Sequence, residues 1–150
     1  MYTVRHLLQE KGNQVWSIAP GATVYEALEL MAAKNCGALL VIERGSVAGM
    51  FTEREYARQV ILKGRSSKTT TVGELMATEV LYVSPDDTIE NCMALMTDRR
   101  VRHLPVMDNG KLAGVVSIGD IVKAVISDRE FTIRELERYI TGGHTSDFSV

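Results

Sequence analysis

The sequence has few cysteines and no long apolar run. Its two cysteines, Cys36 and Cys92, form neither a C-x-x-C pair nor a metal-binding spacing, and two isolated thiols suit a reducing cytoplasm. No apolar run approaches the roughly 18 residues that span a bilayer, and Met1–Leu8 lacks the apolar segment of a signal peptide. We therefore expect a soluble, cytoplasmic protein that binds no membrane.

An excess of either charge is also missing. The 150 residues include 17 basic and 19 acidic side chains, which give a formal net charge of −2. This balance argues against nucleic acid as a partner, because such surfaces hold phosphates with many Lys and Arg side chains. Any phosphate ligand must therefore be held by local groups. An apolar content of 45% with 24% charged residues is typical of a globular protein.

Catalytic motifs are the third absence. The sequence contains no G-x-S-x-G, no glycine loop followed by a Walker lysine, no G-x-G-x-x-G and no H-E-x-x-H. We therefore expect a protein that is not an enzyme and that requires no metal.

What the sequence does contain is an internal repeat. A shift of 65 positions lays Val15–Ile61 on Val80–Ile126 without a gap, and it places Gly49 on Gly114. Upstream, the segment that begins at Thr3 resembles the one that begins at Thr71, at a shift of 68. We expect a first repeat with its linker at 1–66, a second repeat at 67–127, an amphipathic C-terminal helix at 128–141 and a disordered tail at 142–150.

Each repeat is expected to form a strand, a helix, a hairpin and a second helix, which is an α/β (α+β) fold. Thr23 and Glu26 have the spacing of a capping box, and the copy of their helix begins at Thr88. Apolar runs on either side of a turn predict the hairpins. The expected strands are Val15–Ile18, Ala38–Ile42 and Val47–Phe51, then Val80–Val83, Leu104–Met107 and Leu112–Val116; the second helices begin at Thr52 and Ser117 and end at Leu62 and Ile126.

The two corners between hairpin and second helix share one pattern. Thr52 is followed three residues later by Glu55, and Ser117 by Asp120. On a structural interpretation, the hydroxyl caps the helix and the acid complements its dipole. On a functional interpretation, the helix N-terminus holds a phosphate while the carboxylate accepts both hydroxyls of a ribose. The spacing alone leaves both interpretations open.

These corners, the tandem halves and the segment Val101–Val106 resemble the paired motifs of cystathionine-β-synthase (CBS) domains, which form the Bateman module. The resemblance covers Thr3 to Ile126, and the stretch Arg129–Leu136 is similar to stand-alone two-repeat proteins of bacteria and plant organelles. It implies two repeats packed about a pseudo-dyad, a homodimer, and a regulatory, signal-transduction role toward a target protein that the sequence does not identify. It also implies an adenine nucleotide between the repeats: AMP first, with ADP, ATP or NAD as other candidates. Members of the family also bind S-adenosylmethionine.

Carried over residue by residue, the resemblance implies two nucleotide sites. In the first, Ser117 binds phosphate and Asp120 binds ribose. The strand entry at Arg102 and His103 faces the phosphate. The alternative for Arg102 is a solvated strand-edge charge, and His103 can equally be a polar residue at the strand entry. The adenine slot of this site comprises Gln14, Val15, Trp16, Gly37 and Val115, and core packing is the alternative role of Trp16. The second site comprises Thr52, Glu55, Arg54, Met50, Thr78 and Val80.

The second site departs from the family pattern, because Glu55 stands where an aspartate is expected. Its longer side chain completes a capping box with Thr52, which favours the structural interpretation there. The competing hypothesis for the whole chain is a dimerisation scaffold that binds no nucleotide and holds a partner protein.

Overall fold

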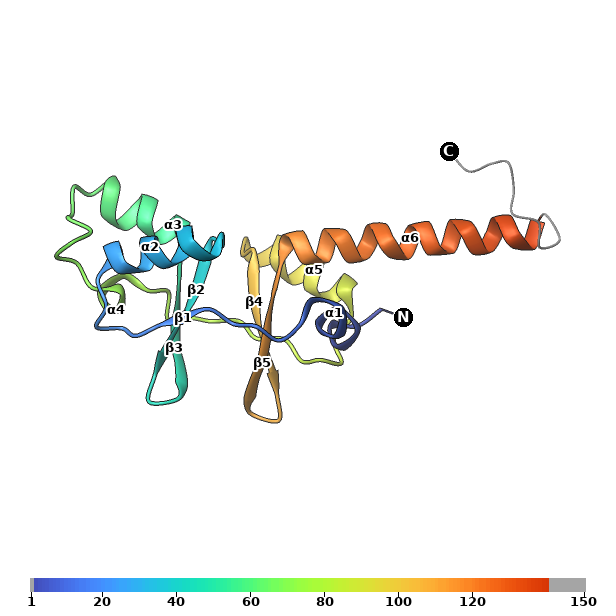
Figure 1. Ribbon diagram of the computed structural model, residues 1–150, viewed down its shortest axis with the longest axis horizontal. Coiled ribbons are helices and arrows are strands. Elements are labelled where there is room, and N and C mark those ends of the chain that lie inside the picture. Colours follow the sequence, from blue (N-terminus) through green and yellow to red (C-terminus); the bar gives the residue numbers. More distant parts are fainter. Residues whose placement is uncertain (1, 141–150) are drawn as a thin grey trace. The chain divides into compact units, whose positions relative to one another are not determined.

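A computed structural model describes residues 2–140, with the side chain of Phe131 left out. The packing divides the chain into two compact units (Figure 1). The first, which we call the central unit, comprises Gln14–Tyr82. Among the described residues, the second, the terminal unit, joins residues 2–13 to residues 83–140. Both units contain helices and strands, so the predicted mixed α/β class is confirmed.

The central unit packs its helices on a three-stranded sheet of order β1-β2-β3. Strand β1 is parallel to β2, and β2 is antiparallel to β3. The elements in chain order are β1 (Ser17–Ile18), α2 (Val24–Lys34), β2 (Ala38–Glu43), β3 (Ser46–Thr52), α3 (Glu53–Glu55), the π-helix η1 (Tyr56–Ile61) and α4 (Val72–Leu75). Its buried core is Val24, Ala27, Met31, Leu39, Val41, Phe51, Val60 and Val72.

Helix α2 begins at the predicted capping box. The amide of Glu26 donates to Thr23 Oγ1 at 3.1 Å, and the Glu26 carboxylate accepts from the Thr23 amide at 3.3 Å. These contacts satisfy two amides that the first helical turn leaves without a helical partner. The box thus fixes the start of α2, which presents Val24, Ala27 and Met31 to the core.

Two positions show why this chain needs glycine at a hairpin. Arg44 and Gly45, between β2 and β3, both have positive φ, at 52° and 79°, as two-residue hairpin turns require. At Gly49, an added Cβ would lie 2.6 Å from the carbonyl oxygen of Ala77. The missing side chain lets the segment at Ala77 pair with Met50 on β3 through two backbone hydrogen bonds of 2.9 Å.

The terminal unit combines the N-terminal helix with the second hairpin. Its elements are α1 (Val4–Lys11), α5 (Ile89–Arg99), β4 (His103–Asp108), β5 (Lys111–Ser117) and α6 (Ile118–Ile140). Strands β4 and β5 form an antiparallel pair. The amide of Val4 donates to the carbonyl oxygen of Asp87 at 2.9 Å, and the amide of Ile89 donates to the carbonyl oxygen of Tyr2 at 3.2 Å. Helix α1 therefore packs with the second half of the chain, where Val4 and Leu7 are buried.

Several element boundaries differ from the prediction. The first strand is shorter than Val15–Ile18, and Val83 forms only an isolated parallel bridge with Val106. The second helix of the first repeat is a short α-helix followed by a π-helix. The predicted end of the other second helix at Ile126 is wrong, because α6 has 23 residues and runs to Ile140, and no Gly or Pro lies between Ile126 and Ile140.

The predicted tail at 142–150 lies outside the described residues, as does residue 141. Among the helices at residues 2–140, none combines the length and apolar character that crossing a membrane requires.

Candidate functional site

The corner between β5 and α6 holds two of the predicted site residues in direct contact. Ser117 ends β5, and α6 begins at the next residue. The amide of Asp120 donates to Ser117 Oγ at 3.2 Å, and the amide of Ser117 donates to Asp120 Oδ2 at 2.8 Å. This reciprocal pair is a capping box, so the structural interpretation of the motif is realised. The same contacts fix the half-buried carboxylate at the N-terminus of a long helix.

The start of β4 lies directly beside this corner. His103 is the register partner of Ser117 across the hairpin, and the carbonyl of Arg102 accepts from the amide of Ile118 at 2.8 Å. Arg102 is exposed and His103 is half-buried. The terminal unit therefore brings together Ser117, Asp120, Arg102 and His103, with Val115 two residues before the corner on β5.

Lys11 also belongs to this corner, and the sequence analysis missed it. Its Nζ atom lies 2.5 Å from Asp120 Oδ2 and 2.6 Å from the carbonyl oxygen of Val115. Lys11 is the last residue of α1, where a cation complements the helix dipole. The sequence shows the basic residue, but it does not show that Lys11 contacts Asp120, because the two lie 109 positions apart.

The electrostatics of the corner favour an ionised carboxylate. Burial alone raises the pKa of Asp120, but the hydrogen bonds from Lys11 and Ser117, with the Lys11 charge, outweigh burial and lower it. Near neutral pH, Asp120 is thus a charged acceptor, which makes strong hydrogen bonds to hydroxyl donors.

The corner between β3 and α3 in the central unit is arranged differently. The Thr52 hydroxyl donates to the Glu55 carboxylate, and the amide of Arg54 donates to Thr52 Oγ1 at 3.2 Å. The longer Glu55 side chain thus takes the hydroxyl itself, whereas Asp120 takes a backbone amide. The other residues predicted for this site lie nearby in the chain trace, because Met50 pairs with Ala77, which precedes Thr78 and Val80.

The residues predicted for the first adenine slot, apart from Val115, belong to the central unit. Trp16 packs against the core of that unit, and Lys34 Nζ lies 4.4 Å from the centroid of the Trp16 ring. The carbonyl of Gly37 accepts from the amide of Glu53 at 3.1 Å. Core packing therefore engages Trp16, while a ligand role for Gln14, Val15, Trp16 and Gly37 stays a prediction.

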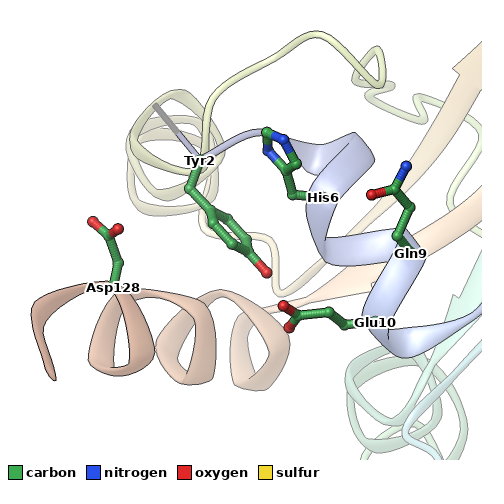
Figure 2. Close-up of a pocket in the computed structure, with 5 residues that line it drawn as sticks. All are labelled: Tyr2, His6, Gln9, Glu10 and Asp128. Atoms are coloured by element: carbon green, nitrogen blue, oxygen red, sulfur yellow. The ribbon is translucent and has the colours of Figure 1, made fainter. Parts of the chain in front are cut away.

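Two pockets lie elsewhere in the units. One, of about 290 Å³, lies between α1 and α6 in the terminal unit and is lined by Tyr2, His6, Gln9, Glu10 and Asp128. Figure 2 shows the Tyr2 hydroxyl pointing toward the Glu10 carboxylate. Burial and the nearby Glu10 raise the pKa of Tyr2, which therefore stays protonated at neutral pH.

The second pocket, of about 650 Å³, lies in the central unit between α2 and the helical segment after β3. Its lining includes Cys36, Gly37, Glu53 and Tyr56. Of the predicted site residues, only Gly37 lines either pocket. Among residues 2–140, no group of three or more His, Cys, Asp or Glu side chains could hold a metal ion.

Comparison with known proteins identifies the family. The CBS domain family matches the chain twice, at residues 4–61 and 72–127. The chain belongs to the CBS-domain family. The resemblance that the paired corners carry is thereby confirmed, and this CBS-domain pair is a regulatory module of a generally non-catalytic family.

Three relatives illustrate the match. The mitochondrial CBS domain-containing protein CBSX3 of Arabidopsis thaliana is 39% identical over 95% of this chain and 73% of its own length. A solved structure of a protein with CBS domains from Burkholderia ambifaria is 50% identical, with a TM-score of 0.82 over 84% of this chain and 95% of that chain. The crystal structure of CBSX2 in complex with AMP is 27% identical, with a TM-score of 0.67 over 86% of this chain and 99% of that chain.

Proposed function

We propose that this CBS-domain pair binds an adenine nucleotide at the Ser117–Asp120 corner and regulates a target protein through it. The observation that carries the proposal is the half-buried carboxylate of Asp120, which is kept ionised beside a helix N-terminus. The anionic carboxylate can accept hydrogen bonds from a ribose diol, and the adjacent helix N-terminus can bind a phosphate. Together they match these two parts of a nucleotide.

The proposed roles follow from where each group lies. The N-terminus of α6 carries a partial positive charge, and the Ser117 hydroxyl stands at that end, so the phosphate binds there. Arg102 is exposed next to the corner, and its guanidinium offers a two-pronged contact to phosphate oxygens. Asp120 accepts the ribose hydroxyls. His103 is the register partner of Ser117, and Val115 lies two residues before it on β5, so we assign both to the same site.

AMP is the first ligand we propose. The relative CBSX2 was solved in complex with AMP, which supports an adenine nucleotide for this chain too. ADP, ATP and NAD share the ribose diol and a 5′-phosphate, so the groups of this corner can also bind them. No metal is needed for these contacts, because Arg102, Ser117 and the helix end supply the positive charge and the donors.

The corner at Thr52 and Glu55 is the weaker candidate for a second nucleotide. Its hydroxyl already donates to its own carboxylate, so a phosphate must displace that contact before Thr52 can donate to it. We therefore expect this site to fill at higher nucleotide concentration than the Ser117–Asp120 site.

We also propose that the protein is a homodimer. Large apolar side chains are exposed on or directly after helices of both units, among them Ile61, Leu62, Val122 and Ile126. Exposed apolar surface of this kind is typical of protein interfaces. Light scattering at micromolar concentration tests this proposal, and a strict monomer contradicts it.

The second candidate function is a scaffold that binds no nucleotide. It is favoured by the capping box itself, because Ser117 and Asp120 satisfy each other's amides without any ligand. A thermal-shift panel of AMP, ADP, ATP, NAD and S-adenosylmethionine separates the two, since a ligand that binds only the folded state raises the melting temperature. We expect AMP to raise it, whereas a panel without any shift favours the scaffold.

A further inference from the structure

The Lys11 ammonium group occupies the acceptor that the proposed function assigns to the ribose. Its Nζ atom contacts both Asp120 Oδ2, at 2.5 Å, and the carbonyl oxygen of Val115, at 2.6 Å. The Lys11 side chain is 34% exposed and that of Asp120 is 20% exposed, so water screens this ion pair only in part. The contact therefore keeps a cation at the carboxylate oxygen.

The number of acceptor positions on Asp120 Oδ2 is the next consideration. A carboxylate oxygen offers about two lone-pair sites. On Oδ2, one site accepts from the Ser117 amide and the other accepts from Lys11 Nζ. A ribose diol that donates to both carboxylate oxygens needs one of these two sites.

Lys11 is the donor that can leave. The Ser117 amide is fixed by the backbone between β5 and α6, and Ser117 Oγ holds Asp120 in return at 3.2 Å. Lys11 instead reaches Asp120 through a long, flexible side chain at the end of α1. The next residue, Gly12, has a positive φ of 95°, so the helix ends there. A diol therefore displaces the ammonium group rather than the amide.

The central unit has no such lysine at the equivalent place. Met50 lies 65 positions before Val115 and is its repeat equivalent. The carbonyl of Met50 accepts from the backbone amide of Ala77 at 2.9 Å, whereas that of Val115 accepts from the Lys11 side chain. The lysine contact thus distinguishes the Ser117–Asp120 corner from its copy in the first repeat.

We propose that Lys11 is a specificity-determining residue of this site, whose ammonium group competes with the ribose hydroxyls for Asp120 Oδ2. The inference rests on the proposed nucleotide site and deepens it. Lys11 then weakens every ligand that uses a ribose diol and leaves ligands without the diol unaffected. A purely structural lysine, by contrast, affects both kinds of ligand alike.

The experiment compares AMP with 2′,3′-dideoxyadenosine monophosphate, which keeps the base and the phosphate but lacks both hydroxyls. Calorimetric titrations give the affinity ratio of the two ligands for wild type, for Lys11→Met and for the control Lys111→Met, which removes an exposed lysine at the start of β5. We expect Lys11→Met to raise the AMP-to-dideoxy ratio about threefold, as for loss of a partly exposed ion pair, and Lys111→Met to leave it unchanged.

An unchanged or lower ratio in Lys11→Met, with AMP still bound, overturns this inference alone. Absence of AMP binding to wild type overturns the proposed function together with it. If Lys11→Met does not fold, the wild-type protein provides the test through the NMR signals of the Lys11 side chain. Competition requires saturating AMP to shift these signals more than the dideoxy ligand does, and equal shifts contradict it.

Discussion

Replacing Asp120 by asparagine removes the charge of the proposed ribose acceptor while keeping its size. The amide oxygen of Asn can still accept from the Ser117 amide, which lies 2.8 Å from Asp120 Oδ2, so we expect α6 to keep its N-terminal cap. The change therefore tests the acceptor with little effect on the fold. Circular dichroism of the variant checks that the helical content is unchanged.

The magnitude follows from the contacts of the carboxylate. A hydrogen bond to a charged group contributes about 1.5–3 kcal/mol. A ribose diol makes two such bonds, but one replaces the contact of Lys11 with Asp120 Oδ2, which offsets part of the gain. The net loss in Asp120→Asn is thus about one charged hydrogen bond, which weakens AMP binding roughly 10- to 150-fold.

Calorimetric titration with AMP measures this loss, and Glu55→Gln is the matched control. The control neutralises the Glu55 carboxylate, which accepts a hydrogen bond from the Thr52 hydroxyl at the other corner. We expect Glu55→Gln to change the tighter AMP affinity less than about twofold, because it touches the other corner. Equal losses in the two variants, or a loss only in Glu55→Gln, would refute the assignment of the main site to Asp120.

Three further outcomes are expected. Arg102→Ala should weaken AMP strongly and adenosine little, and this difference should shrink at high salt; an unchanged AMP-to-adenosine ratio contradicts the phosphate role of Arg102. Gly49→Ala should lower the free energy of unfolding, measured in urea, by about 1–3 kcal/mol, because the added Cβ would meet the Ala77 carbonyl. In the control Gly21→Ala the added Cβ meets nothing within 4 Å, so the free energy of unfolding should change by less than about 0.5 kcal/mol. Contacts lower the pKa of Asp120, so the ionised carboxylate stabilises the fold above the ordinary carboxyl pKa near 4, and this stabilisation is lost as the pH falls below that value. The free energies of unfolding of wild type and Asp120→Asn should therefore converge in acid. A difference between them that stays constant with pH contradicts this.

The sequence predicted the features that depend on local pattern. Both hairpins, the capping box at Thr23 and the corner at Ser117 and Asp120 lie where the sequence places them, because turn residues, caps and alternating apolar runs act over a few positions. The repeat, its paired corners and the segment Val101–Val106 also carried the resemblance to CBS domains, which the family match confirms.

Features that depend on contacts between distant segments could not be predicted in this way. The contact of Lys11 with Asp120 joins residues 109 positions apart, and the repeat gave no sign that α1 packs with the second half. The continuity of α6 was not predicted, because the repeat ends at Ile126. Ser127 and Asp128, residue types that often cap helices, lie within α6. Sequence periodicity does not reveal which distant residue a side chain contacts. It also does not reveal whether a helix continues past a residue that could cap it.

The most direct test of the central claim is an amide NMR titration of the wild-type protein with AMP. If the nucleotide binds at the Ser117–Asp120 corner, the amide signals of Ile118, Gly119 and Asp120 shift in a saturable way, and they shift at lower AMP concentration than those of Glu53, Arg54 and Glu55. If millimolar AMP leaves the amides of the first turn of α6 unshifted, the Ser117–Asp120 corner is a helix cap alone and the proposed nucleotide site is wrong.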